Sequence, residues 1–170
     1  MECGNGCCGN GELVRDYRLS IIMGIRRRSR ELAMQALFYM EMAHNDSEEK
    51  LELFCKSYTP PKKALPFFLK LIKGVIHYRS EIDSIIERFS SHWKISRMAG
   101  VDRNIIRIAV YEMLFCHDIP SKVSINEAIE IGKKFGTEES GAFINGILDS
   151  IHLAFEKKDI KIEVEPQITI

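Results

Sequence analysis

A cluster of arginines stands directly before an apolar helical repeat. Arg26, Arg27, Arg28 and Arg30 fall within five consecutive positions, and the apolar stripe of residues 32–40 follows them. Guanidinium groups present forked donors that match phosphate oxygens. Cations at a helix N-terminus oppose the helix dipole, which costs about 0.3–1 kcal/mol for each charge. The cluster therefore indicates either a phosphate-binding site or a solvated charged turn.

Two phenylalanines stand off the core stripes of their predicted helices. Phe38 falls on the helix side that carries Arg27 and Arg30, opposite the core stripe. Phe143 lies about 100° from the centre of the apolar stripe that follows it, given the helical repeat of 3.6 residues. Each ring either packs on a neighbouring helix or stacks on an unpaired base. Lys133 and Lys134 add positive charge close to Phe143 in the chain.

The sequence offers little for catalysis or metal binding. It contains no P-loop, no G-x-G-x-x-G, no G-x-S-x-G and no H-E-x-x-H. Asp102, and Ser124 together with Glu127, are interpreted as N-terminal helix caps. The cysteines of segment 3–8 have a C-x3-C-C spacing that is not typical of zinc sites. We therefore expect no catalytic residue, no metal and no cofactor.

Composition indicates a globular protein whose charge is balanced. Hydrophobic residues make up 45%, and 24 Lys and Arg balance 24 Asp and Glu, so the formal net charge is zero. Any contact with RNA must therefore come from a local patch. No apolar run reaches the roughly 18 residues that span a bilayer, and the N-terminus lacks the apolar core of a signal peptide. We expect a cytoplasmic protein without a membrane partner.

Apolar periodicity predicts helices from residue 23 to residue 156. Residues 1–22 show no clear periodicity and are expected to form a disordered extension, and residues 157–170 a flexible tail. The connector 90–100 divides the helical part into halves, about 23–95 and 96–156. The segment 102–116 is apolar nearly all round, so other helices must cover it on more than one side. Gly132 and Gly146 are expected to permit close approach of neighbouring helices.

Three stretches taken together resemble the NusB family of transcription antitermination factors. They are RRRSRELAMQALF (26–38), VDRNIIRIAVYEML (101–114) and SKVSINEAIEIGKKFGTEESGAFINGILDSI (121–151). The resemblance implies an all-α fold of two small packed helical bundles with about seven helices. It also implies a role without catalysis: binding of single-stranded boxA RNA together with the ribosomal protein NusE. The pair would act in the RNA polymerase antitermination complex and promote read-through in ribosomal RNA operons.

The resemblance also assigns roles to individual residues. The four arginines match the basic RNA contacts of the family, and Phe143 matches an aromatic residue at its RNA site. Asp102 matches an acidic position that faces NusE, and Glu139 belongs to an acidic pair tied to antitermination strength. Ala142 departs from the family, which often has lysine there. The predicted RNA-binding set is Arg26, Arg27, Arg28, Arg30, Phe38, Lys133, Lys134 and Phe143, and the partner-binding pair is Asp102 and Glu139.

Two other functions remain open from the sequence. A NusB-like domain also precedes the catalytic domain of certain ribosomal RNA methyltransferases, so this chain could be a detached RNA-binding module of that kind. A helical adaptor whose arginines are simply solvated is the second alternative. The sequence leaves both a monomer and a homodimer open.

Overall fold

Helices make up all the regular structure of the residues that the computed structural model describes, which are 10–90, 93–157 and 159–160; for 10–21 only the backbone is described. The expected all-α fold with about seven helices is confirmed. No helix in these ranges is long and apolar enough to cross a bilayer. The elements are α1 (Asn10–Met42), α2 (Glu48–Tyr58), α3 (Leu65–His77), α4 (Arg79–Phe89), the short 3-10 helix η1 (Ile95–Arg97), α5 (Gly100–Phe115), α6 (Ser121–Phe135) and α7 (Ser140–Glu156).

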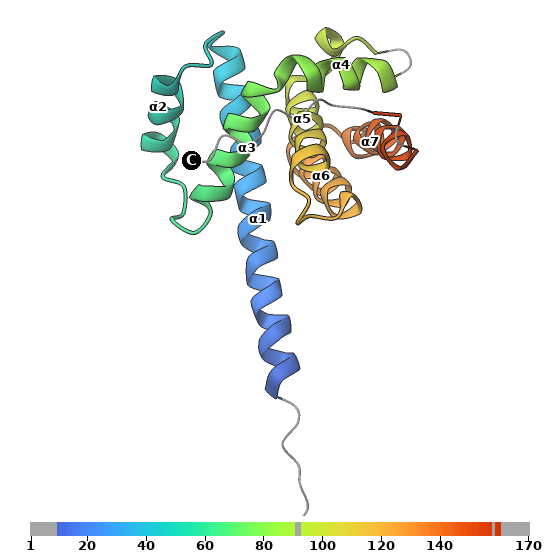
Figure 1. The fold of residues 1–170 in the computed structure, drawn as a ribbon. Helices are drawn as coiled ribbons and strands as arrows, with labels where there is room; N and C mark the ends of the chain where they lie inside the picture. Colours follow the sequence, from blue (N-terminus) through green and yellow to red (C-terminus); the bar gives the residue numbers. More distant parts are fainter. Residues whose placement is uncertain (1–9, 91–92, 158, 161–170) are drawn as a thin grey trace, which may run out of the picture.

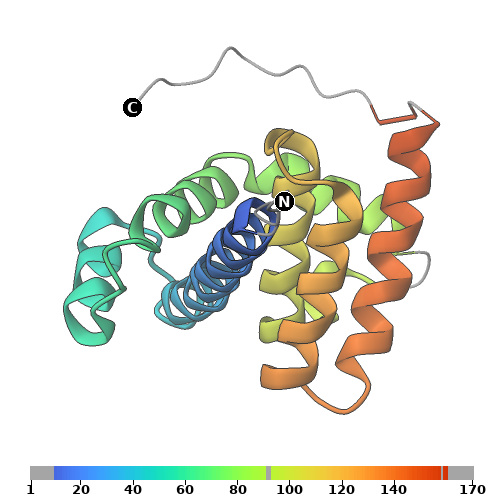
Figure 2. The same ribbon diagram turned by 90° about the horizontal axis from the view of Figure 1, so that it is seen from below.

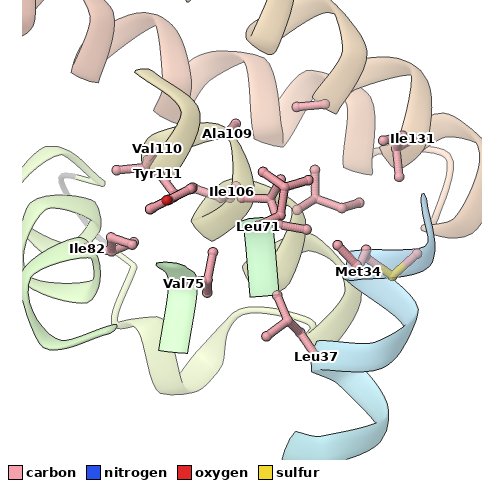
Figure 3. Close-up of a cluster of buried hydrophobic side chains, with 14 of the residues drawn as sticks. Met34, Leu37, Leu71, Val75, Ile82, Ile106, Ala109, Val110, Tyr111 and Ile131 are labelled. Atoms are coloured by element: carbon pink, nitrogen blue, oxygen red, sulfur yellow. The ribbon is translucent and has the colours of Figure 1, made fainter. Parts of the chain in front are cut away.

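Helix α5 is the centre of the fold. Every residue from Asn104 to Leu114 is buried, which agrees with a sequence that is apolar nearly all round. Figure 3 shows side chains of α5 meeting those of α1, α3, α4 and α6. A Cβ placed at Gly74 of α3 would lie 2.1 Å from the Tyr111 ring, so these two helices approach too closely for any larger residue. The expectation that several helices cover this segment is confirmed.

Helices lie on both sides of α5, as Figures 1 and 2 show. Helices α1, α2 and α3 form one group, and α6 and α7 lie on the other side. Helix α4 packs on α5 and α7, although a boundary near residue 95 would place it with the first group. Two observations explain the difference: Ile82 of α4 is buried, and Asp83 of α4 accepts two hydrogen bonds from Arg107 of α5, at 2.7 and 2.8 Å.

Helix α1 is longer than the apolar pattern indicated. It begins at Asn10, and its first turns project away from the other helices in Figure 1. Residues 10–22 are thus helical, which corrects the expected disorder there; residues 1–9 lie outside the described residues. An anchored helix lengthens without forming a new nucleus, because each added residue gains one hydrogen bond. Apolar periodicity detects only the part of such a helix that packs on a core.

Most of the predicted flexible tail also lies outside the described residues. In the part that is described, the Asp159 N–H donates to the carbonyl of Ala154 over 3.0 Å, and Ile160 packs against the core.

Candidate nucleic-acid interface

The first two arginines of the cluster pair with carboxylates of the C-terminal half. Arg26 donates to Asp118 over 2.7 Å, and Arg27 donates from Nε and Nη2 to both oxygens of Glu127. The hydrogen bond to Glu127 raises the pKa of Arg27. Burial opposes ionisation of Asp118, but Arg26 outweighs burial and lowers the pKa of that carboxyl. The Arg27 side chain remains 49% exposed, and its Nη1 takes no part in the pair.

The middle of α1 meets the end of α6 around one buried carboxylate. Glu31 accepts from Arg28 over 3.1 Å and from Lys134 over 2.6 Å. Both cations remain about half exposed, with 47% of Arg28 and 58% of Lys134 open to solvent. Lys133, also exposed, pairs with Glu130 over 2.9 Å. One surface, here called the basic strip, therefore gathers most of the predicted cations: Arg26, Arg27, Arg28, Lys133 and Lys134.

Arg30 does not belong to the basic strip. It is only 3% exposed, and its Nε and Nη2 donate to Glu112 over 2.7 and 2.9 Å. Its Nη1 lies 3.5 Å from Glu127, which Arg27 also holds. The prediction that Arg30 contacts RNA is therefore wrong for this structure, because every part of its donor fork is turned to internal carboxylates. Arg30 instead joins α1 to α5 and α6.

The expected cap at the start of α6 is also corrected. The helix begins at Ser121, with Pro120 at the cap position. Ser124 donates to Glu112 over 2.6 Å, and Glu127 holds two arginines, so both residues serve the buried ion-pair cluster. Glu112 is one of three helical carboxylates that stand out in the sequence, with Asp102 and Glu127, but the sequence assigned it no role. A carboxylate inside a helix that is otherwise apolar nearly all round was the available signal, because a buried charge needs a partner.

Phe38 lies apart from the basic strip. It is half-buried in α1 and packs against the start of α5: a Cβ at Gly100 would lie 2.9 Å from its ring. Eleven residues separate it from Arg27, about 16 Å along a helix. The structure therefore does not bring Phe38 together with the arginines, and its contact with α5 explains why it stands off the main stripe.

Phe143 is partly exposed and has an aromatic neighbour that the sequence did not reveal. It is half-buried against the core, and its ring forms a T-shaped pair with Trp93, with centroids 5.5 Å apart. Trp93 comes from the segment between α4 and η1 and is 52% exposed. The two residues, here called the aromatic pair, are 50 positions apart in the chain. No spacing rule in the sequence could have joined them.

Close packing of α6 on α7 fixes the start of α7, the helix that carries Phe143, against the helix that carries Lys133 and Lys134. A Cβ at Gly132 would lie 2.4 Å from Ile144, which confirms the expected close approach at Gly132. The Lys133 side chain packs on Gly141: its Cγ would lie 3.1 Å from a Cβ at that position. Phe143 follows Gly141 by two residues. Gly146 is exposed and no described atom lies within 4 Å of its Cβ position, so the expected close approach there is wrong.

The two predicted partner-binding residues have different environments. Asp102 is 6% exposed, and its Oδ1 is buried without a hydrogen-bond partner among the described residues. It does not cap α5, which begins at Gly100 after Ala99. Glu139 is exposed at the cap position of α7, without a side-chain capping bond. Asp102 therefore offers an unpaired oxygen, and Glu139 a solvated charge.

The fold and this surface define the class of protein. It is an all-helical scaffold that exposes a basic strip and an aromatic pair, two features that suit the binding of single-stranded nucleic acid. Residues 27–153 match the model of the NusB family. The chain belongs to the NusB family, so the resemblance seen in the sequence is confirmed.

Curated relatives agree along nearly their whole length. The chain is 58% identical over 137 residues to the transcription antitermination protein NusB of Desulfatibacillum aliphaticivorans, covering 81% of this chain and 96% of that protein. It is 51% identical over 130 residues to the protein of the same name from Geobacter sulfurreducens, covering 76% and 94%.

Solved structures share the fold. A structure of T. maritima NusB superposes with a TM-score of 0.69 at 42% identity, covering 79% of this chain and 97% of that chain. A complex of the antitermination factors NusB and NusE with double-stranded RNA contains a chain with a TM-score of 0.70 at 28% identity, covering 78% and 98%.

Proposed function

We propose that this chain is a transcription antitermination factor. It binds a single-stranded boxA-type RNA together with NusE, acts with RNA polymerase in the antitermination complex, and promotes read-through in ribosomal RNA operons. The observation that carries the proposal is 58% identity over 96% of a curated antitermination protein. A solved complex of a similar chain with NusE and RNA supports the two partners. The role involves no bond chemistry, and its place is the cytoplasm, with the transcription machinery.

RNA binding is an exchange of partners at the basic strip. The Arg26–Asp118 and Lys133–Glu130 pairs are exposed and contribute only about 0–1 kcal/mol each, so a phosphate can replace these two carboxylates at small cost. Arg27 and Arg28 are about half exposed and keep donors outside their internal pairs. These two arginines, with Lys133 and Lys134, would hold successive phosphates. Phe143 would stack on a base that is not paired in a duplex.

NusE would meet the start of α5 and the start of α7. The buried, unpartnered Oδ1 of Asp102 supports this placement, because an unpaired buried oxygen is destabilising until a donor reaches it. A lysine, an arginine or a backbone N–H of NusE would satisfy it. Glu139 is exposed and could take an exposed cation of the same partner.

A competition experiment tests the proposal. Fluorescein-labelled single-stranded boxA RNA is bound to the protein, and the unlabelled strand or its annealed duplex is added as competitor, with and without NusE. We expect the single strand to compete about tenfold better than the duplex, because pairing removes the base that stacks. NusE should tighten binding. Absence of binding under all conditions would instead identify a structural adaptor, and equal competition by the duplex would contradict recognition of a single strand.

A further inference from the structure

We propose that the segment 93–97, between α4 and α5, is a second RNA-contacting element. Trp93 stacks on an unpaired base next to the one that Phe143 takes, while Lys94 and Arg97 hold the flanking phosphates. The choice of RNA as the ligand rests on the proposed function.

The exposure of Trp93 is the first observation. An indole is a large apolar group, and 52% of this one is open to solvent. Its contact with Phe143 is T-shaped, with ring planes at 76°. A T-shaped pair occupies one face of one ring and the edge of the other, so at least one face of Trp93 stays outside the pair. That face can receive a base, and stacking on aromatic side chains is how unpaired bases are commonly held.

The backbone around Trp93 is held in place, which lowers the entropy cost of binding. The N–H of Trp93 donates to the carbonyl of Ser90 over 3.0 Å, and the Ser90 hydroxyl donates to the carbonyl of Trp93 over 2.7 Å. The N–H of Ile95 donates to Glu87 over 3.2 Å. Arg103 of α5 donates to the carbonyls of Ile95 and Met98 over 2.9 and 3.1 Å.

The charge of the segment is the third observation. Lys94 and Arg97 are exposed, and no carboxylate of the described residues lies within the 4.0 Å that defines an ion pair with either. Every cation of the basic strip, by contrast, has an internal carboxylate partner. Uncompensated positive charge therefore lies within four residues of Trp93. Exposed cations interleaved with an exposed aromatic ring are the arrangement that binds a single strand.

Trp93 is the only tryptophan in the chain, so its fluorescence reports on this site directly. We expect single-stranded boxA RNA, added without NusE, to quench the emission of Trp93 in parallel with binding. Trp93→Ala should weaken RNA binding about tenfold, and Trp93→Phe should retain most of it, because a phenyl ring still stacks. Replacing Lys94 and Arg97 by Gln should make the log–log salt dependence shallower by about 1.4, since each phosphate contact on a single strand contributes about 0.7.

Tyr58→Ala is the matched control. Tyr58 is 58% exposed at the end of α2 and stacks on Phe54 with centroids 4.5 Å apart, so it is also an exposed ring packed on another ring. We expect its removal to leave RNA binding unchanged. Circular dichroism confirms that each variant is folded.

Several results would overturn the inference. One is unchanged RNA affinity in folded Trp93→Ala, while removal of Arg27 and Arg28 weakens binding; the proposed function would then stand without this element. A second is loss of NusE binding with RNA binding intact, which would make the segment a protein-binding surface. Wild-type protein that binds no boxA RNA would overturn both the inference and the proposed function.

Discussion

Arg27 and Arg30 show how two similar side chains of one helix serve different ends. They lie three positions apart and both reach Glu127. Arg30 is buried against Glu112, so its charge contributes to joining three helices. Arg27 reaches the same carboxylate from outside and stays half exposed. Glu127 is therefore both a structural ligand of Arg30 and a competitor of phosphate for Arg27.

This double role leads to a prediction for Glu127→Gln. The amide no longer competes by charge for Arg27, so we expect boxA RNA to bind about two- to fivefold more tightly, a gain of roughly 0.4–1 kcal/mol. Arg30 keeps its two bonds to Glu112, so the fold should persist. Fluorescence anisotropy at fixed salt measures the change.

Glu52→Gln is the control for that experiment. Glu52 pairs with Lys56 on the exposed face of α2, at 3.7 Å, so the substitution removes the same charge away from the basic strip. Its RNA affinity should equal that of the wild type. Weaker binding by Glu127→Gln would contradict competition and indicate that Glu127 orients Arg27 for phosphate.

Sequence reasoning predicted the residue types of the site better than their environments. The cluster of Arg26, Arg27 and Arg28 is evident in the sequence, but consecutive helix positions point about 100° apart, and each arginine pairs with a different carboxylate. The burial of Arg30 is not evident there, because it depends on Glu112 and Ser124, which other helices contribute. Trp93 was missed for a similar reason: its link to Phe143 exists only after α4 and α7 have packed together.

At the scale of elements, the site depends on how closely the helices approach α5 and one another. Gly74 allows α3 to touch the Tyr111 ring, and Gly132 allows α6 to touch Ile144. The second contact fixes the start of α7 and with it Phe143. Small residues at helix crossings therefore determine where the exposed ring stands relative to the lysines of α6.

A pair of glycine substitutions tests this packing. Gly74→Ala places a Cβ 2.1 Å from the Tyr111 ring, so we expect a loss of about 1–3 kcal/mol in the free energy of unfolding, as for other overpacked cores. Gly146→Ala meets no described atom within 4 Å and removes a flexible residue from a helix, so it should gain up to about 1 kcal/mol. Urea unfolding followed by circular dichroism measures both. Equal effects of the two substitutions would contradict the close approach at Gly74.

Apolar periodicity predicted the helices that pack and failed where packing is absent or shared. The helix 102–116 was recognised because its apolar residues surround it, and α5 lies close to that range. The first turns of α1 were missed because they project from the core. The packing of α4 on α5 was missed because it depends on the hydrogen bonds between Asp83 and Arg107, and nothing in the sequence links these two residues.

At the scale of the whole molecule, positive and negative charges balance in number, and the cations of the basic strip are also paired locally with carboxylates. The chain has a formal net charge of zero, and each cation of the basic strip pairs with a carboxylate, which Arg28 and Lys134 share. Long-range attraction of RNA is therefore weak, and binding depends on short-range exchange of partners. Such a protein gains affinity from a second protein that extends the same surface, which is consistent with a joint role with NusE.

The most direct test of this account is the salt dependence of binding to single-stranded boxA RNA. For wild-type protein we expect a log–log slope of about −4, the value for about six phosphates on a single strand, four at the basic strip and two at segment 93–97. Replacing Arg27 and Arg28 by Gln should weaken binding and make the slope shallower by about 1.4. The control replaces Lys62 and Lys63, exposed between α2 and α3, and should change neither quantity. An unchanged affinity and slope in the folded arginine variant would contradict the claim that these arginines hold the RNA.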